Sequence, residues 1–444
     1  WIKGSGTDYL PIYGNPIHNG SRVEIDAITD NAGHTWKWAV TRWWVHGLGT
    51  QEKPYVIDDL TIDAKKAGSA ISINNSRSYF IIEECKLYNS SDTGAGIFIL
   101  NSTNGVIRDC RILNNSGPGI FIDPTNNTII EDTYIYNSTH GIHLNSSCKA
   151  NLIFNNTLFK NRETGILVEN NCFNNTIRSN NLTLNNYGIK LLTNSDNNSI
   201  IDNDIINTVN DGLRIISNAD FNRVLKNRIK NSDGVGVILS GYVSNTTLEQ
   251  NNITYSDEQG IYLSNHCYDN NLTDNDIVYS GSVGIISNGN IHRTKINGNN
   301  ISYNGRSGIA NGIYFISQSD ENTISQNVIM NNSDNGIEVG GTALDFLDFF
   351  TIHNNTIGNN SEYGIYMQYS PNSTISENKI EFNNEDGICV EYSNDTDIIQ
   401  NEAMSNGKGS GVGIRLSRSF SGNIQYNNLS ENSRAGIALN LCEH

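Results

Sequence analysis

A glycine followed by an aliphatic residue recurs at almost constant spacing through most of this chain. Successive glycines mostly lie 22 to 24 residues apart. They are Gly96, Gly119, Gly141, Gly165, Gly188, Gly212, Gly236, Gly260, Gly284, Gly312, Gly336, Gly364, Gly387, Gly413 and Gly436. A fixed period of this length is typical of a solenoid, in which each repeat packs only on its neighbours. Function is then expected along the faces of a long stack rather than in one central pocket.

Each period contains a Gly-Ile-x-Ile unit followed by two shorter Asn-x-Ile units, as in residues 165–182. Apolar and polar residues alternate over three to five positions, which is the periodicity of a β-strand. Three such strands fill the period and leave no room for a helix. We therefore expect an all-β fold, a right-handed single-stranded parallel β-helix of about 16 coils with three short strands per coil.

Two asparagine columns support this assignment. The main column contains Asn156, Asn180, Asn203, Asn227, Asn251, Asn275, Asn299, Asn327, Asn355, Asn378, Asn401 and Asn427. The weaker one contains Asn104, Asn127, Asn151, Asn175, Asn198, Asn222, Asn270 and Asn322. Stacked amides can hydrogen-bond from coil to coil, and Asn tolerates the left-handed backbone of a sharp corner. We interpret both columns as structural.

The two ends of the chain differ from the repeats. All five tryptophans lie at the N-terminal end, at Trp1, Trp36, Trp38, Trp43 and Trp44. A solenoid needs a cap over its first coil, so we predict a cap over residues 1–50 and a β-helix over 51–444. No capping segment follows the last glycine. An open coil exposes strand edges, so either the natural chain continues or this end contacts a partner, such as a second copy.

The charge of the chain bears on its partners and location. Lysine and arginine total 29 against 46 acidic residues, a formal charge of −17. Nucleic-acid binding requires a basic stripe, so it is not expected. No stretch approaches about eighteen consecutive apolar residues, so we expect no membrane span. The acidic balance suits a secreted or cell-surface protein, and frequent Asn-x-Ser/Thr triplets are potential glycosylation sites.

The residue after each repeated aliphatic points outward and changes from coil to coil. This outward row contains Phe98, Phe121, His143, Leu167, Lys190, Arg214, Ile238, Tyr262, Ile286, Tyr314, Glu338, Tyr366, Cys389, Arg415 and Ala438. Tyr262, Tyr314 and Tyr366 lie on alternate coils, about 10 Å apart, which is close to two sugar units. Tyrosine rings suit sugar faces, so we predict that these three and Arg214 bind carbohydrate. The alternative is that aromatic residues simply favour strand surfaces.

A charged patch covers five consecutive coils at Asp123, His143, Glu169, Lys190 and Arg214. A uronate lyase or epimerase needs a cation for the sugar carboxylate and a base for the α-proton. A glycosidase needs two carboxylates about 5 to 10 Å apart. We take these five as candidate catalytic residues of a polysaccharide lyase, hydrolase or epimerase, with surface charges that pair for solubility as the alternative.

The sequence contains only weak indications of a metal or cofactor site. Asp202-Asn-Asp204 and Asp274-Asn-Asp276 resemble Ca²⁺ ligand pairs, and no other cofactor is expected. His140 and His143 lie three residues apart, which in a strand places them on opposite faces or around a corner, a poor geometry for chelation. Stacked cysteine side chains point in parallel, which favours buried free thiols. Cys389 stands at an outward position and is expected to be the exposed thiol.

From about Gly47 to its end, the chain resembles the right-handed parallel β-helix proteins of the NosD-like group. Residues 47–63, Gly-Leu-Gly-Thr-Gln-Glu-Lys-Pro-Tyr-Val-Ile-Asp-Asp-Leu-Thr-Ile-Asp, are similar to the start of that domain in secreted archaeal proteins. The resemblance implies a carbohydrate-binding or sugar-hydrolysing protein. The founding group is linked to periplasmic copper delivery, but this chain has no Met/His cluster. The Asp-Pro-His-Asp motif of β-helix alginate epimerases is absent, since Asp123-Pro124 is followed by Thr and Asn.

Two functions remain in view. The first is an extracellular β-helix protein that binds, and in one form processes, polysaccharide along the outward face of its first sheet. The second is a structural cell-surface subunit of a layer, filament or adhesin, without catalysis.

Overall fold

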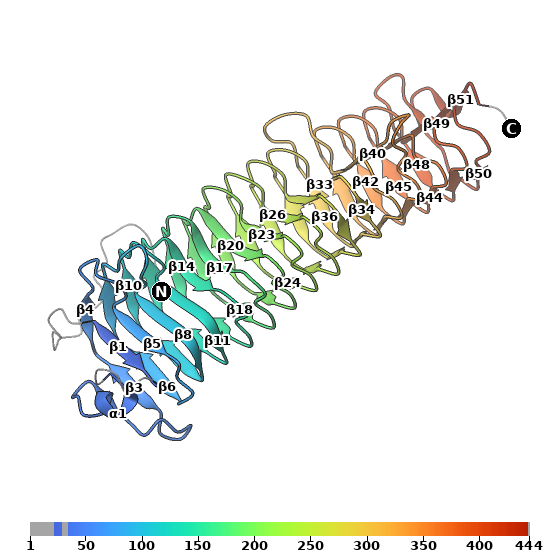
Figure 1. The fold of residues 1–444 in the computed structure, drawn as a ribbon. Coiled ribbons are helices and arrows are strands. Elements are labelled where there is room, and N and C mark those ends of the chain that lie inside the picture. The colour runs from blue at the N-terminus through green and yellow to red at the C-terminus, as the bar shows by residue number, and fades with distance from the viewer. Residues whose placement is uncertain (1–21, 29–33, 443–444) are drawn as a thin grey trace.

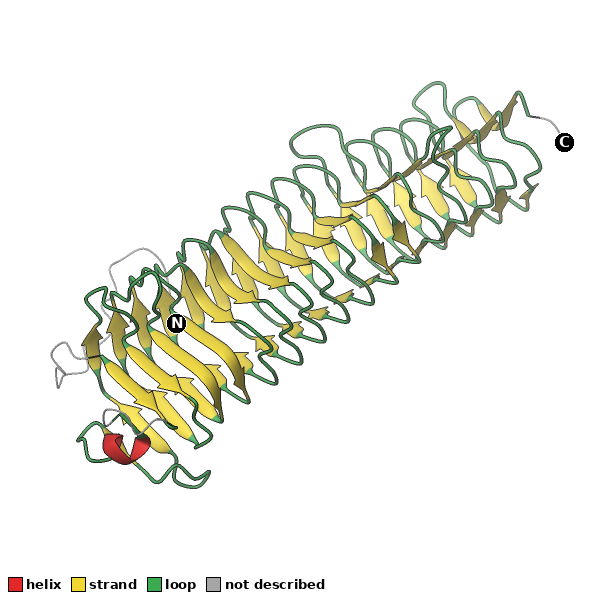
Figure 2. Ribbon diagram, in the orientation of Figure 1, coloured by secondary structure: helices red, strands yellow, loops and turns green. Residues whose placement is uncertain are grey.

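Short strands stacked along one axis make up almost all of the described chain (Figure 1). The computed structural model describes residues 22–28 and 34–442. Three sheets, which we call A, B and C, run along the stack, and almost every coil adds one strand to each sheet in turn (Figure 2). Their strands pair in parallel, except for the first pair of sheet B, which is antiparallel. The expected right-handed parallel β-helix of about 16 coils is confirmed.

Apart from its first two strands, sheet A is formed by the strands that begin at or beside the repeated glycines. Its strands are β1 (Val23–Asp26), β5 (Ile71–Asn74), β8 (Ile97–Thr103), β11 (Ile120–Asn126), β14 (His140–Leu144), β17 (Thr164–Val168), β20 (Tyr187–Leu192), β23 (Leu213–Ile216), β26 (Val237–Ser240), β29 (Ile261–Ser264), β33 (Ile285–Asn288), β37 (Ile313–Ile316), β40 (Ile337–Gly340), β43 (Ile365–Gln368), β46 (Ile388–Glu391), β49 (Val412–Ser417) and β51 (Ala435–Asn440).

Sheets B and C are formed by the two Asn-x-Ile units. Sheet B contains β2 (Val45–His46), β3 (Tyr55–Asp58), β6 (Phe80–Glu83), β9 (Gly105–Arg108), β12 (Ile129–Glu131), β15 (Leu152–Phe154), β18 (Thr176–Arg178), β21 (Ser199–Ile201), β24 (Arg223–Leu225), β27 (Thr247–Glu249), β31 (Asn271–Thr273), β35 (Lys295–Asn297), β38 (Thr323–Ser325), β41 (Thr351–His353), β44 (Thr374–Ser376), β47 (Asp397–Ile399) and β50 (Ile424–Gln425). Sheet C contains β4 (Thr61–Asp63), β7 (Lys86–Tyr88), β10 (Arg111–Leu113), β13 (Tyr134–Tyr136), β16 (Thr157–Phe159), β19 (Asn181–Thr183), β22 (Asp204–Ile206), β25 (Arg228–Lys230), β28 (Asn252–Thr254), β32 (Asp276–Val278), β36 (Asn300–Ser302), β39 (Val328–Met330), β42 (Thr356–Gly358), β45 (Lys379–Glu381) and β48 (Glu402–Met404). The short strands β30 (Cys267–Tyr268) and β34 (Ile291–His292) pair with each other at a corner.

The N-terminal segment contributes both a strand and aromatic packing. Strand β1 pairs in parallel with β5, so sheet A begins inside the segment expected to form a cap. The four-residue helix α1 (Trp36–Ala39) holds Trp36, whose ring stacks on Tyr55 at 4.5 Å between centroids and whose Nε1 donates to Ser76 Oγ at 2.9 Å. Trp1 lies outside the described residues.

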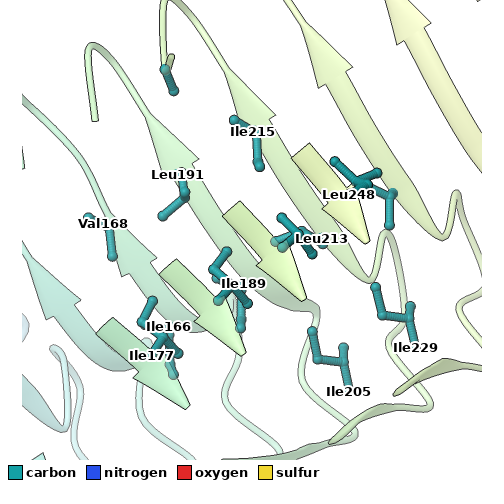
Figure 3. Packing of buried hydrophobic residues seen from close by; sticks show 14 of the residues in the cluster. Ile166, Val168, Ile177, Ile189, Leu191, Ile205, Leu213, Ile215, Ile229 and Leu248 are labelled. Carbon is teal, nitrogen blue, oxygen red and sulfur yellow. The ribbon is translucent and has the colours of Figure 1, made fainter. Parts of the chain in front are cut away.

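The core is a stack of aliphatic side chains in register. Ile166, Ile189 and Leu213 lie one above another on consecutive strands of sheet A (Figure 3). These side chains are completely buried, as are their counterparts from the other two sheets. Burying each such side chain stabilises the fold by about 1.5–3 kcal/mol, so the repeat itself supplies the stability of the coil.

The repeated glycines let neighbouring coils approach. A Cβ built on Gly236 would lie 2.5 Å from the carbonyl oxygen of Gly260 and 2.4 Å from Cγ2 of Ile253. Similar contacts recur at Gly212, Gly260 and Gly312. Glycine is therefore required here by the backbone of the next coil.

The asparagine columns form hydrogen-bonded ladders inside the coil, although not for the conformational reason expected. The left-handed residue at each corner is the one before the ladder position, such as Asp202 (φ 51°) before Asn203. Asn104 and Asn127 were wrongly placed in the weaker column: they are themselves left-handed corner residues (φ 62° and 52°), and Thr128, after Asn127, holds the ladder position. Asn203 Nδ2 donates to Ile177 O and to Asn227 Oδ1, each at 2.9 Å. A third ladder, not recognised in the sequence, contains Asn161, Asn185, Asn304, Asn332, Asn360, Asn383 and Asn406. The role of the ladder asparagines is thus to satisfy buried polar groups by hydrogen bonds along the stack.

All seven cysteines are free thiols, including the stacked ones for which this was expected. The expectation that Cys389 is the exposed thiol is wrong, because its side chain is buried, with 1% exposure. Its neighbours in the outward row, Tyr366 and Arg415, are large and cover the small thiol. Burial raises the pKa of Cys389 well above its usual value.

Candidate functional site

The outward row of sheet A has the register that the repeat predicts. Phe98 pairs with Phe121, Phe121 with His143, and His143 with Leu167. The pairing continues coil by coil through Lys190 to Ala438. One straight line of variable side chains therefore runs along sheet A, at about 4.8 Å per coil.

Aromatic rings and a histidine–glutamate pair form the N-terminal part of this row. Phe98 stacks on Phe121 at 5.2 Å between ring centroids, and Phe121 meets the edge of His143 at 4.8 Å. His143 Nε2 lies 3.0 Å from Glu169 Oε1. The hydrogen bond with His143 lowers the pKa of Glu169. Glu169 is therefore a carboxylate at neutral pH, held against the imidazole of His143.

His140 and His143 lie on the same face of the sheet, with ring centroids 5.2 Å apart. The expectation that they face opposite sides or straddle a corner is wrong. The strand bends at Gly141, so Gly141 and Ile142 both face inward and the residues on either side of them face outward. Burial, with a smaller contribution from His143, lowers the pKa of His140 to about 4. His140 is therefore neutral at physiological pH.

A groove of about 310 Å³ opens beside these histidines. Its lining residues are Asp92, Thr93, Gly94, Phe98, Gly117, Pro118, Phe121, Thr139, His140 and His143. Two phenylalanine rings and two imidazoles are thus among the residues that line this cavity. A groove with apolar walls and a few polar groups is a typical ligand site.

Two cations follow His143 along the row. Lys190 and Arg214 are register partners on β20 and β23. The Lys190 ammonium lies 3.2 Å from the centroid of the Tyr187 ring, and the Arg214 guanidinium lies 5.6 Å from it. Arg214 Nη1 also lies 3.5 Å from Asp211 Oδ2. Burial, with a smaller contribution from Arg214, lowers the pKa of Lys190 to about 8.

Asp123 does not join the histidine–glutamate pair. Its Oδ2 accepts a hydrogen bond from Asn145 Nδ2 at 3.3 Å, and Asn145 in turn accepts from Asn170. These residues form a separate polar column at the ends of the sheet A strands. Of the five candidate catalytic residues, the structure brings together His143 with Glu169 and Lys190 with Arg214.

The three predicted carbohydrate-binding tyrosines lie on alternate coils of the row, as the spacing requires. Ile286 separates Tyr262 from Tyr314, and Glu338 separates Tyr314 from Tyr366. The hydroxyl of Tyr366 donates to Glu391 at 3.1 Å. All three rings are partly exposed on the outer face of sheet A.

A second outward column was missed because of the bend at each glycine. Strict alternation would turn the residue before the glycine inward, yet this residue faces outward beside the row. The column includes Pro118, His140, Tyr187, Asp211, Gln259, Asn311, Asn335 and Tyr363, connected by hydrogen bonds from the glycine amides of the preceding coil. The signal was present in the repeated glycine itself, which permits two consecutive inward residues.

The described residues 22–28 and 34–442 contain no cluster of three or more His, Cys, Asp and Glu side chains able to hold a metal ion. Of the two weak Ca²⁺ pairs, Asp204 is engaged by Arg228 and Asp276 by Asn300. Within the same ranges no helix is long and apolar enough to cross a membrane.

Two family models match the chain. The model described as "Right handed beta helix region" matches residues 41–182 and 311–443. The model described as "Periplasmic copper-binding protein (NosD)" matches 159–246 and 210–346. Copper does not fit the residues present, because Met367 is fully buried, and Met330 and Met404 lie three coils apart, about 14 Å, on sheet C.

Solved β-helix structures are similar to this chain at low sequence identity. The Dettilon tailspike protein is 16% identical with a TM-score of 0.50, over 70% of this chain and 62% of its own. The A-module of the Azotobacter vinelandii mannuronan C-5 epimerase AlgE6 is 14% identical with a TM-score of 0.49, over 73% and 87%. The periplasmic alginate epimerase AlgG is 14% identical with a TM-score of 0.42, over 72% and 81%. The tailspike likeness shows the fold, and no curated protein matches the sequence.

Proposed function

Because the chain belongs to the right-handed β-helix family, we propose that it binds polysaccharide along the outer face of sheet A, in a location outside the cytoplasm. A straight row with one side chain every 4.8 Å or so is commensurate with an extended polymer. The row carries aromatic rings for sugar faces and cations for sugar carboxylates.

The observation that carries this proposal is the cluster between Phe98 and Arg214. There the aromatic groove, the His143–Glu169 pair and the cations Lys190 and Arg214 lie on one line. A chain with a formal charge of −17 repels polyanions in general, so these cations localise the attraction for an acidic sugar. We infer that an acidic sugar unit lies over Lys190 and Arg214, with its neighbours over the phenylalanine rings.

The same arrangement contains the groups needed for proton transfer. A base that removes the α-proton of a uronate has to lie close to a cation that neutralises the sugar carboxylate. The His143–Glu169 pair precedes Lys190 by one to two coils, about 5 to 10 Å along the row. Processing of the bound polymer is therefore proposed as the further step, to be assayed together with binding.

Lys190→Ala and Arg214→Ala are expected to weaken binding of acidic oligosaccharides by about tenfold each, since each removes a charge-assisted contact. Binding is measured by calorimetry after a glycan array has selected the oligosaccharides, and the same samples are assayed for lyase and hydrolase products. Arg228→Ala is the matched control, because that exposed cation belongs to sheet C and pairs with Asp204.

Absence of any polysaccharide binding by the wild-type chain would reject the proposal. Concentration-dependent assembly in light scattering would then support the structural cell-surface subunit. Equal losses for Arg228→Ala and the sheet A variants would show that only overall charge matters.

Binding of acidic sugars should also fall as the pH rises. The pKa of Lys190 is lowered to about 8, so above this pH the folded protein loses the ammonium that attracts a carboxylate. Between about pH 7 and about pH 9 most Lys190 side chains become neutral. Lys190→Arg keeps its charge over this range and should bind equally well at both values. A wild-type affinity that does not change with pH would contradict the role given to Lys190.

A further inference from the structure

The C-terminal half of the outward row contains a carboxylate between two tyrosines. Tyr314, Glu338 and Tyr366 are register partners on the consecutive strands β37, β40 and β43. They lie five to seven coils beyond Lys190, and Glu338, six coils away, is about 29 Å from it along the row. This cluster is separate from the cations and has different chemistry.

Two buried amides hold the Glu338 carboxylate. Asn311 Nδ2 donates to Glu338 Oε2 at 2.8 Å, and Asn335 Nδ2 donates to the same oxygen at 3.0 Å. The two asparagines are only 4% and 6% exposed. Their amide oxygens are fixed in turn, since Asn311 Oδ1 accepts from the Asn335 N–H and Asn335 Oδ1 from the Tyr363 N–H. The carboxylate is thus oriented before any ligand arrives.

The other carboxylate oxygen remains available. Glu338 Oε1 has no hydrogen-bond partner among the residues that the structure describes. It lies beside Gly340, where a Cβ would be 3.4 Å from Oε1 and 3.1 Å from Cε2 of the Tyr314 ring. A side chain at position 340 would therefore crowd both groups. A fixed acceptor next to an aromatic ring is suited to a sugar hydroxyl.

The tyrosines are themselves held in place as neutral phenols. Tyr366 stacks on Tyr363 at 5.3 Å between centroids, with planes 22° apart. Its hydroxyl is bonded to Glu391, and the pKa of Tyr366 is raised by burial and by that carboxylate. The pKa of Tyr314 is raised by burial and by Glu338. Both rings are therefore uncharged platforms over a wide pH range.

The charges around this cluster are negative. Asp334 and Glu391 lie near Glu338, and burial, with a smaller contribution from Glu338, raises the pKa of Asp334. The cation three coils further on, Arg415, is bound to the buried Asp386 through Nε–Oδ2 and Nη2–Oδ1 contacts of 2.5 and 3.0 Å. A sugar carboxylate placed at Glu338 would meet like charges and no free cation in the cluster.

We propose that Glu338, Tyr314 and Tyr366 form a second sugar subsite that takes an uncharged sugar unit. Glu338 Oε1 accepts hydrogen bonds from the hydroxyls of this sugar, and a tyrosine ring packs against the apolar face of the sugar. This proposal rests on the proposed function, since it assumes a polysaccharide on sheet A, and it adds the class of sugar. The row then distinguishes an acidic unit at Lys190 and Arg214 from an uncharged one at Glu338.

The test measures binding of matched neutral and acidic oligosaccharides by calorimetry. Glu338→Gln keeps the shape but turns one oxygen into a donor, and Tyr366→Ala removes a platform. Each is expected to weaken neutral-sugar binding about tenfold and to leave acidic-sugar binding unchanged. Glu381→Gln, on sheet C beside Lys379, and Tyr303→Ala, at a corner away from sheet A, are the controls and should bind like the wild type.

Four results would overturn the proposal. The first is unchanged neutral-sugar binding in Glu338→Gln, and the second is an equal loss for acidic sugars. The third is a wild type that binds acidic sugars through Lys190 but no neutral sugar, which would leave the proposed function intact. Ca²⁺ binding that disappears in Glu338→Gln while sugar binding persists would also overturn it, in favour of a cation site. No binding of any sugar would reject the proposed function itself.

Discussion

Gly236→Ala should destabilise the protein by about 3 kcal/mol or more, the upper range for overpacking in a core. The new Cβ would lie 2.4 Å from Cγ2 of Ile253, 2.5 Å from the carbonyl oxygen of Gly260 and 2.8 Å from Oγ of Ser256. The methyl group of isoleucine can move, but the carbonyl belongs to the backbone of the next coil. The coils would have to separate, which weakens the hydrogen bonds of sheet A on both sides.

Urea denaturation followed by circular dichroism measures this effect through the shift of the unfolding midpoint. The matched control is Gly308→Ala, where no atom lies within 4 Å of the new Cβ and the backbone is not left-handed. Gly308→Ala should leave the midpoint unchanged or raise it slightly. Equal midpoints for both variants would contradict the close approach of coils at the repeated glycines.

Asn203→Ala should cost a similar amount, about 3 kcal/mol, for a different reason. Asn203 Oδ1 accepts from both the backbone N–H and Nδ2 of Asn180, each at 3.0 Å. Its Nδ2 donates to Ile177 O and Asn227 Oδ1. Alanine leaves several of these groups buried without a partner, and each such group costs about 1–3 kcal/mol.

The control for the ladder is Asn252→Ala, an exposed position on β28 that no ladder uses. The urea midpoint of Asn252→Ala should equal the wild-type value within error. The midpoint of Asn203→Ala should lie at a clearly lower urea concentration in the same experiment. A ladder variant as stable as Asn252→Ala would mean that the columns reflect composition rather than a stabilising network.

The fold and the outward row could be predicted from the sequence because a single period determines them. Once the glycines gave the register, the residue after each aliphatic had to align with its counterpart on the next coil. The pairing of His143 with Leu167 and of Lys190 with Arg214 confirms this. The period also made it possible to separate the repeated positions from the positions whose side chains vary from coil to coil.

The local geometry of the candidate site could not be predicted in the same way. A strict alternation of inward and outward residues ignores the bend at each glycine. It therefore assigned His140 to the wrong face and did not predict that Tyr187, Asn311 and Asn335 lie beside the outward row. Exposure also depends on the size of the neighbours, which is why Cys389 is buried between Tyr366 and Arg415. Contacts such as His143–Glu169 depend on side-chain torsions, which a repeat pattern does not contain.

The most direct test of polysaccharide binding is a crystal structure of the protein with the oligosaccharide that binds most tightly. We expect sugar density along the outer face of sheet A, over the groove at Phe121 and His143 and reaching Lys190 and Arg214. Density confined to sheet B or sheet C, with sheet A bare, would contradict the proposed function.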